Sequence, residues 1–161
     1  LAVAEIDMVY VGIKPDWHEY TNELFERFEI DSRRVKVIDG GADRNGTVMN
    51  IAEAIVAEHG KNEGDIILTH DAVRPFVTEK IIKDNIELYQ AQTPQTFRFG
   101  DLRRNYYSLS EEQKKKLTDT CSVFTACNED IYLVVGDALN FKITTDSDLK
   151  MANALAELSE K

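Results

Sequence analysis

The chain has 161 residues, 43% of them hydrophobic and 30% charged, so it can bury a sizeable core and is typical of a globular domain rather than a disordered segment. Its formal net charge of −10 argues against general binding to nucleic acids or anionic membranes, because it lacks the surplus of positive charge that neutralises phosphates. Two cysteines without metal-ligand spacing, no apolar run of membrane-spanning length and an N-terminus without a basic leader favour a reducing, cytoplasmic setting.

In the first half of the chain, predicted strands alternate with helices. Ile6–Ile13 is mostly apolar and β-rich, as expected of a strand covered on both faces. Apolar residues at helical spacing then predict a helix with an aromatic stripe in the core: Trp17, Tyr20, Leu24, Phe25 and Phe28. A second strand, Val35–Ile38, leads through the loop DGGADRNG into a helix from about Thr47. A third strand, Ile66–Leu68, precedes the sequence THDAVRPF.

The second half continues the same alternation. Thr78 is expected to cap a helix, and Ser110 has capping-box spacing to a glutamine three residues later. Strands are predicted at Ile131–Val135 and Phe141–Ile143, and a closing helix begins near Thr145. The pattern predicts one α/β domain with a mostly parallel sheet and helices on both of its faces.

The sequence HDAVRP follows the third predicted strand, at the position where parallel α/β sheets bind their ligands. Asp71 could hold a divalent cation, since magnesium favours one or two carboxylates together with substrate phosphates. Arg74 has a planar fork that suits phosphate oxygens, and Pro75 stiffens the turn. The alternative is an Asp71–Arg74 pair that only stabilises the turn, with His70 packed beneath it.

The loop VIDGGADRNGTV is a second candidate binding segment. Gly40 and Gly41 allow a close approach of the backbone to a ligand, and the Thr47 hydroxyl and the amides of the helix start could meet an anion or the polar edge of a base. The loop is neither a dinucleotide-binding fingerprint nor a P-loop. The alternative is a flexible turn capped by Asn45 or Thr47.

A third candidate set comes from two separate segments, QAQTPQTF and NFKITT. Gln92, Thr93 and Gln95 surround Pro94, which favours an irregular loop over a strand. Lys142 lies in a short β stretch, where it either has an anionic partner or extends its charge into solvent.

Together and in this order, GGADRNGTV, THDAVRPF, QAQTPQTF and LNFKITTDSDLKMA resemble the cytidylyltransferases of sugar-alcohol phosphates over nearly the whole chain. The resemblance implies a Rossmann-like nucleotidyltransferase sandwich. Val73, Phe76 and the segment YYSLSEEQKKKLTDTCSVF favour the branch that joins CTP and D-ribitol 5-phosphate to CDP-ribitol and pyrophosphate, for teichoic acid or another cell-surface polymer. The alternative is the branch that acts on 2-C-methyl-D-erythritol 4-phosphate in isoprenoid synthesis.

The same resemblance implies roles for particular residues. Asp71 is expected to bind Mg²⁺ near both substrates, Arg74 and Thr93 to contact the sugar-alcohol phosphate, and Lys142 to stabilise charge on the reacting phosphates. A further group is expected to form the site for the cytidine part of CTP: Gly40, Gly41, Arg44, Thr47 and the backbone of Ala72.

Two segments of the family pattern are missing from this sequence. A Gly-rich loop of the type LAGGxGxRMG, with a lysine after it, would precede Leu1, and a dimerisation β-arm would lie near residues 86–88. We therefore expect a single cytidylyltransferase domain over residues 1–161 without these segments, and a homodimer. Two other interpretations stay open: a nucleotide-binding module without activity, and an α/β interaction domain whose polar loops only cap strands.

Overall fold

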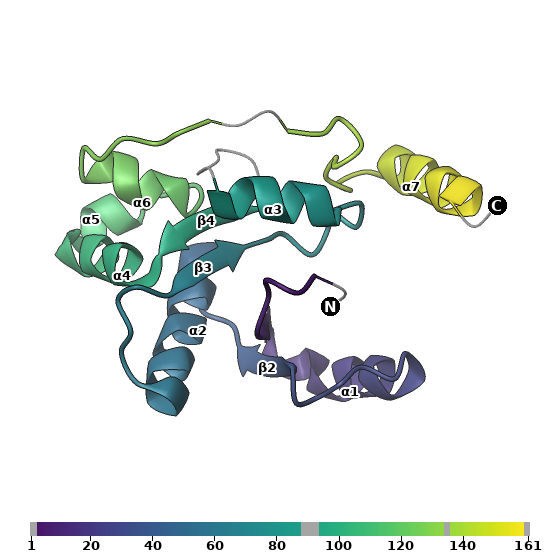
Figure 1. Ribbon diagram of the computed structural model, residues 1–161, viewed down its shortest axis with the longest axis horizontal. Helices are drawn as coiled ribbons and strands as arrows, with labels where there is room; N and C mark the ends of the chain where they lie inside the picture. The colour runs from purple at the N-terminus through teal and green to yellow at the C-terminus, as the bar shows by residue number, and fades with distance from the viewer. Residues whose placement is uncertain (1–2, 88–93, 134–135, 160–161) are drawn as a thin grey trace. The chain divides into compact units, whose positions relative to one another are not determined.

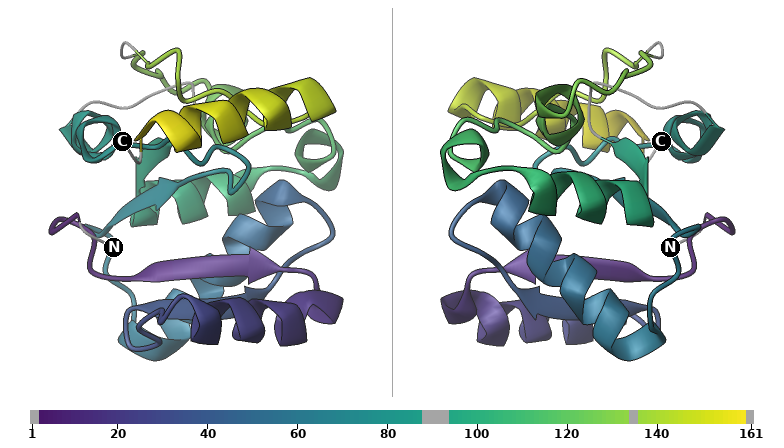
Figure 2. Two further views of the ribbon diagram at one scale, coloured as in Figure 1. Left: turned by 90° about the vertical axis from the view of Figure 1, so that its right-hand side faces the viewer. Right: turned by 90° about the vertical axis from the view of Figure 1, so that its left-hand side faces the viewer.

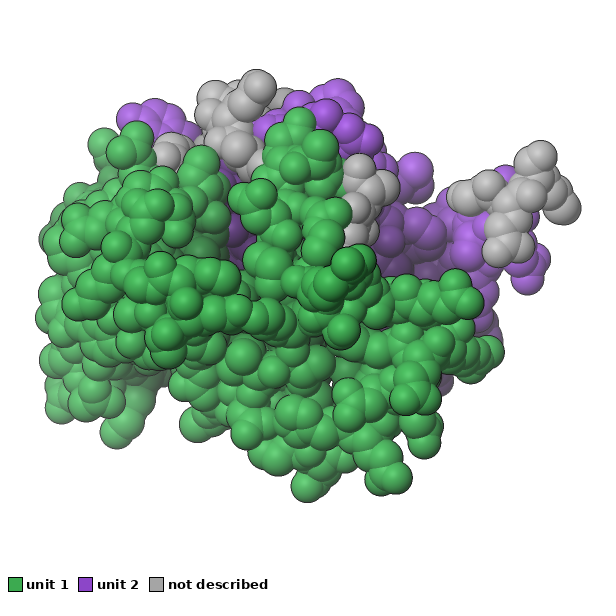
Figure 3. Space-filling view, turned by 60° about the horizontal axis from the view of Figure 1, so that its bottom comes forward, with its two compact units in different colours: residues 1–67, 97–131 green, residues 68–96, 132–161 purple. Residues whose placement is uncertain are grey.

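The computed structural model describes residues 3–87, 94–133 and 136–159 (Figure 1). The chain divides into two compact units, which Figure 3 draws in different colours. Unit 1 comprises residues 1–67 and 97–131, and unit 2 comprises residues 68–96 and 132–161. The single cytidylyltransferase domain expected over residues 1–161 stays a prediction.

Unit 1 contains a parallel pair of strands, β1 (Val9–Ile13) and β2 (Val35–Asp39), with Val9 opposite Val35 and Ile13 opposite Asp39. Between them come the 3₁₀ turn η1 (Pro15–Trp17) and helix α1 (His18–Arg27), so the connection is the helical crossover that parallel strands require. The two views of Figure 2 show α1 and α2 on opposite faces of this pair. Both predicted strands are confirmed, although β1 begins three residues later than the sequence indicated.

Helix α2 (Arg44–His59) begins earlier than predicted. Its N-cap is Asp43, whose carboxylate accepts a hydrogen bond from Gly46 N (2.7 Å), rather than Asn45 or Thr47. Its C-cap is Gly60, whose φ of 79° lies in the left-handed region that favours glycine. The loop GGADRNGT (residues 40–47) is therefore partly helical, and its second half is the first turn of α2.

The remaining elements of the described residues are β3 (Ile66–Thr69), α3 (Glu79–Glu87), β4 (Gln95–Arg98), α4 (Phe99–Ser108), α5 (Glu111–Lys114), α6 (Cys121–Ala126) and α7 (Asp146–Ser159). Strands β3 and β4 form the second pair. Phe99 N donates to the carbonyl of Asp65 at one end (2.8 Å), and Thr69 Oγ1 donates to the carbonyl of Gln95 at the other (3.4 Å), so the two strands run antiparallel.

The α/β class with parallel strands is confirmed by the β1–β2 pair. The β3–β4 pair of the described residues is antiparallel, so a mostly parallel sheet inside a two-faced sandwich stays a prediction. A prediction about one strand is wrong. Gln95, which the sequence assigned to an irregular loop, begins β4 and is 1% exposed. Pro94 is compatible with this strand because it stands directly before it, where no ladder hydrogen bond is needed from its nitrogen.

The core of unit 1 is a hydrophobic cluster formed by α2, β4, α4, α6 and the segments between them. The rings of Phe97 and Phe124 are stacked with centroids 4.8 Å apart, and Leu102 and Val123 are each 1% exposed. Met49, on α2, belongs to the same cluster. The helix that carries the second half of the GGADRNGT loop is thus anchored by core packing.

The aromatic stripe of α1 does not lie in the core as predicted. Trp17, Tyr20 and Phe28 are 55%, 52% and 61% exposed. Trp17 packs edge-on against Tyr20, with ring centroids 5.8 Å apart, and the guanidinium of Arg27 lies 5.3 Å from the ring centre of Phe28. Helical spacing predicted that these rings are buried together, but in the structure Trp17 contacts Tyr20 and Phe28 contacts the cation of Arg27.

In unit 2, Thr78 caps α3 as predicted, accepting from Ile81 N (3.2 Å). The strands predicted at Ile131–Val135 and Phe141–Ile143 are absent: residues 131–133 and 141–143 belong to no strand, and residues 134–135 lie outside the described residues. Tyr132 and Leu133 are 64% and 75% exposed, so this apolar run is not covered as a central strand would be.

Candidate active site

The segment after β3 folds into a tight turn that brings Asp71 and Arg74 together. Arg74 N donates to the carbonyl of Asp71 (3.0 Å), and the carbonyl of Arg74 accepts from His70 Nε2 (3.0 Å). Since a carbonyl can only accept, this hydrogen bond assigns the proton to Nε2. His70 thus closes the turn, which is the structural role that the sequence suggested for it.

The side chain of Arg74 is largely buried. It is 16% exposed, its Nη1 donates to the main-chain carbonyl of Asn140 (2.8 Å), and its Nε lies 3.9 Å from Asp71 Oδ2. A guanidinium in such a position requires polar partners. Nη1 has one in the Asn140 carbonyl, whereas the buried Nε lies beyond hydrogen-bond distance of Asp71 and has no hydrogen-bond partner among the described residues. The bidentate fork predicted for phosphate is therefore partly used within the fold.

Lys142 reaches the same carboxylate from a distant part of the chain. Its Nζ lies 3.4 Å from Asp71 Oδ2. The segment that carries Lys142 is tied to the turn by Ile143 N, which donates to the carbonyl of Val73 (2.9 Å), and by the rings of Phe76 and Phe141, whose centroids are 5.7 Å apart.

The structure thus brings together the three residues predicted to be catalytic, Asp71, Arg74 and Lys142, within unit 2. One carboxylate stands between two cations, which gives the cluster a net charge of +1. The whole chain carries −10. Positive charge is therefore concentrated locally, as an anionic substrate requires.

The residues near Asp71 place a limit on how a metal could bind. Among the described residues, no group of three or more His, Cys, Asp or Glu side chains is placed to hold a metal ion. Asp71 supplies a single carboxylate, so a Mg²⁺ ion there would need further oxygen ligands from substrate phosphates and water. That is the coordination Mg²⁺ commonly takes with phosphate substrates, and the predicted role of Asp71 fits it on this condition.

The candidate nucleotide loop lies in unit 1, where Thr47 holds it closed. Gly41 N donates to Thr47 Oγ1 (2.9 Å), and the same hydroxyl donates to the carbonyl of Asp43 (2.9 Å). Gly40 N donates to the carbonyl of Ile13 (2.6 Å), which fastens the loop to the end of β1. The Thr47 hydroxyl, predicted to meet a ligand, thus makes two hydrogen bonds within the protein.

Gly41 is required by this close approach. A Cβ atom on Gly41 would lie 2.5 Å from the carbonyl carbon of Gly46 and 2.8 Å from Thr47 N, both backbone atoms of α2. Glycine therefore serves here to let the loop touch the helix start.

The start of α2 already has an anion at its positive end. The carboxylate of Asp43 caps it, so a phosphate at the same position would meet like charge, whereas the uncharged polar edge of a base would not. Arg44 turns inward, and its Nη1 donates to the hydroxyl of Thr120 (2.7 Å), which is 1% exposed. These contacts favour a neutral group as the ligand of the loop.

The contacts described above do not test every predicted site residue. They also include two residues that the sequence did not predict. Ala72 lies exposed in the turn, Thr93 is outside the described residues, and of the predicted arm position, residues 86–87 lie in α3 and residue 88 is outside the described part. The sequence did not indicate Asn140 or Thr120, since one acts through its main chain and the other is a buried hydroxyl.

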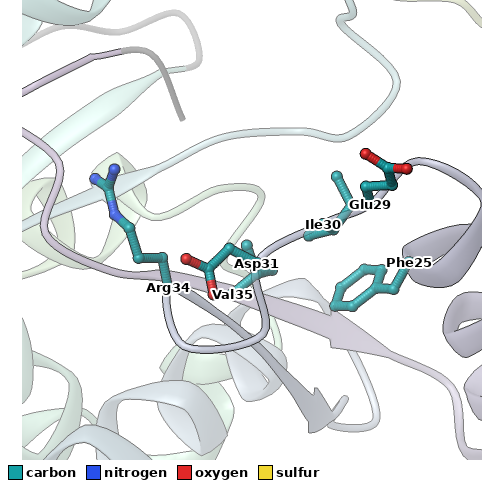
Figure 4. Close-up of a pocket in the computed structure, with 6 residues that line it drawn as sticks. All are labelled: Phe25, Glu29, Ile30, Asp31, Arg34 and Val35. Atoms are coloured by element: carbon teal, nitrogen blue, oxygen red, sulfur yellow. The ribbon is translucent and has the colours of Figure 1, made fainter.

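A surface hollow of about 400 Å³ in unit 1 lies apart from these loops in the sequence. It is lined by Phe25, Glu29, Ile30, Asp31, Arg34 and Val35 (Figure 4). Two of its charged side chains make contacts within the protein: Asp31 accepts two hydrogen bonds from the side chain of Arg33, and Arg34 donates to the carbonyl of Ile6. The hollow contains none of the residues predicted to act on substrate.

The family model described as IspD, 2-C-methyl-D-erythritol 4-phosphate cytidylyltransferase, matches residues 1–88 and 82–157 of the chain. The chain belongs to this family. IspD enzymes are CTP-dependent cytidylyltransferases, so the predicted enzyme class, a nucleotidyltransferase, is confirmed. The two matched stretches overlap at residues 82–88, which include the position expected for the dimerisation arm.

Solved structures of IspD enzymes have the same fold as this chain. A 4-diphosphocytidyl-2C-methyl-D-erythritol synthase aligns with a TM-score of 0.80 and 24% identity over 96% of this chain and 84% of its own. The synthase from Anaerococcus prevotii DSM 20548 aligns with a TM-score of 0.74 and 23% identity, over 97% of this chain and 81% of its own. The 2-C-methyl-D-erythritol 4-phosphate cytidylyltransferase from Francisella tularensis aligns with a TM-score of 0.75 and 24% identity, over 91% of this chain and 79% of its own. At these identities the likeness establishes the α/β fold alone.

The comparisons favour the alternative acceptor over the predicted one. The matching family is named for methylerythritol phosphate, and nothing in it supports ribitol phosphate or teichoic acid. The structure gives a physical reason why Phe76 was a poor guide: its ring packs against Phe141, so its size serves packing within unit 2. Among the described residues, no helix has both the length and the apolar character needed to cross a membrane.

Proposed function

We propose that this IspD-family protein transfers the cytidylyl group of CTP to 2-C-methyl-D-erythritol 4-phosphate. A phosphate oxygen of the acceptor attacks the α-phosphorus of CTP, a new P–O bond forms, and the bond to the β-phosphate breaks. The products are 4-diphosphocytidyl-2C-methyl-D-erythritol and pyrophosphate. The family match carries this proposal, and the Asp71–Arg74–Lys142 cluster supports it.

The cluster has the chemistry that this reaction needs. The attacking phosphate is ionised near neutral pH, so catalysis requires positioning and charge neutralisation rather than a strong base. In our proposal Asp71 would hold Mg²⁺, which would supply neutralisation of the charge on the phosphates. Arg74 and Thr93 contact the acceptor phosphate, and Lys142 stabilises the charge that develops as pyrophosphate leaves.

The GGADRNGT loop has the complementary task of binding the cytidine part of CTP. The residues proposed for it are Gly40, Gly41, Arg44, Thr47 and the backbone of Ala72. The hydrogen bonds of Thr47 and the Asp43 cap support a loop held rigid before the ligand arrives, which lowers the entropic cost of binding. The homodimer and the cytoplasmic location also stay predictions.

The decisive experiment measures pyrophosphate release from CTP and Mg²⁺ with methylerythritol phosphate and, separately, with ribitol 5-phosphate. We expect a clear preference for methylerythritol phosphate. A preference for ribitol 5-phosphate would overturn the acceptor, and no release with either would overturn the proposed reaction.

Substitutions test the assigned residues in the same assay. Asp71→Asn and Lys142→Ala should each lower turnover by about a hundredfold or more, as losses of transition-state charge stabilisation do. Lys80→Ala is the matched control, because Lys80 pairs with Asp84 on the exposed side of α3 and its loss should leave turnover unchanged. Near-normal product formation by Asp71→Asn would refute the role of that carboxylate.

A further inference from the structure

Asp71, the carboxylate to which the proposed function assigns the metal, is already paired with protein cations. Lys142 Nζ lies 3.4 Å from Asp71 Oδ2, and Arg74 Nε lies 3.9 Å from the same oxygen. Only 18% of the Asp71 side chain is exposed, so water screens these charges weakly. A divalent cation that approaches this carboxylate alone meets two positive charges close to its binding position.

The two cations differ in how they are held. Arg74 is 16% exposed and is fixed by the carbonyl of Asn140, so it cannot leave without losing a buried hydrogen bond. Lys142 is 46% exposed and carries its charge on a flexible four-carbon stem. Its backbone is tied beside the turn through Ile143 N and the carbonyl of Val73, so the ammonium group can swing away while the segment stays in place.

We propose that Lys142 makes the Asp71 site select a metal–phosphate complex over the free divalent cation. This inference rests on the proposed function, since it takes Asp71 as the metal ligand. A free cation must push Lys142 into solvent and leaves it without a partner. A cation that arrives with a phosphate brings negative charge to which Lys142 can turn, so the ion pair with Asp71 is exchanged for another ion pair.

The test measures binding of Mn²⁺ alone, by titration calorimetry or by the electron paramagnetic resonance signal of the free ion, to the full chain without nucleotide. Lys142→Gln should bind Mn²⁺ about tenfold more tightly than the wild type, a change of roughly 1.4 kcal/mol. Lys142→Met, which keeps the apolar stem, should give the same gain. Lys80→Gln removes the same charge from α3 and should leave the affinity unchanged.

The site of the gain is tested by combining substitutions. Asp71→Asn should abolish the added affinity of Lys142→Gln. The proposal is overturned if Lys142→Gln binds Mn²⁺ no better than the wild type, if Lys80→Gln gains as much, or if the gain persists without the Asp71 carboxylate. The titration involves no turnover, so a protein that shows the gain but makes no CDP product would overturn the proposed function and leave the metal selection standing.

Discussion

Replacing Gly41 by alanine should destabilise the protein and weaken CTP binding together. The new Cβ would lie 2.5 Å from the carbonyl carbon of Gly46 and 2.8 Å from Thr47 N. Real Cβ atoms essentially never come closer than 3.0 Å to such atoms, so the loop or the helix start must shift by several tenths of an ångström. Both partners are backbone atoms of a helix capped by Asp43, so neither can rotate away.

Overpacking of this kind costs about 1–3 kcal/mol. For a chain of this length that corresponds to a fall in Tm of roughly 2–12 °C. We expect the KM for CTP to rise as well, because the shift displaces the loop that we propose for cytidine. Thermal unfolding and steady-state kinetics over a range of CTP concentrations measure the two effects.

Gly64→Ala is the matched control. The nearest atom to its added Cβ is Asn62 Oδ1 at 3.6 Å, an ordinary contact, so Tm and kinetics should match the wild type. An unchanged Tm for Gly41→Ala would refute the packing argument. A lowered Tm with an unchanged KM for CTP would instead show that the loop does not bind the nucleotide.

Three further predictions follow from hydrogen bonds and burial. Thr47→Val keeps the methyl group but loses the bonds to Gly41 N and the Asp43 carbonyl, so urea unfolding should show a loss of about 1–2 kcal/mol that Thr47→Ser avoids. Burial raises the pKa of the Cys121 thiol to about 12, so a thiol reagent at pH 8 should label Cys121 only after unfolding, and rapid labelling of the native protein would contradict this. Hydrogen bonds from the Thr144 amide and hydroxyl and from the next residue lower the pKa of Asp148 from 3.8 to about 2. A lowered folded-state pKa stabilises above the unfolded value, so the Tm advantage over Asp148→Ala should be complete above pH 3.8 and disappear as the pH falls through about 2.

Features of the fold that depend on neighbouring residues could be predicted from the sequence. The capping box is an example: Ser110 Oγ accepts from Gln113 N (3.3 Å), and Gln113 Oε1 accepts from Ser110 N (3.0 Å). The cap of α3 at Thr78 is another. These motifs are completed within three residues, so the sequence contains all of the groups that form them.

Features of the fold that depend on residues distant in the sequence were harder to predict. An apolar run such as Ile131–Val135 becomes a strand only if another strand pairs with it, and its composition does not reveal whether one does. Likewise, helical spacing put Trp17, at the end of η1, and Tyr20, in α1, on one face, but it could not show that both rings are exposed.

The candidate site was predicted to different degrees for the same reason. Asp71 and Arg74 are three residues apart in one turn, so their pairing was foreseeable. Lys142 is 71 residues from Asp71 and could be connected to it only through the family resemblance. Asn140 contributes its main-chain carbonyl, which every residue type possesses, so its residue type could not predict the contact with Arg74.

The hydrogen bond from Arg44 to Thr120 joins positions 76 residues apart, at the start of α2 and directly before α6. Its acceptor is 1% exposed, so water cannot readily replace the hydroxyl if it is lost. Substitutions at these two positions should therefore be interdependent, and relatives that lack the arginine should be free to lose the hydroxyl as well. Anyone who redesigns the GGADRNGT loop at Arg44 has to redesign position 120 with it.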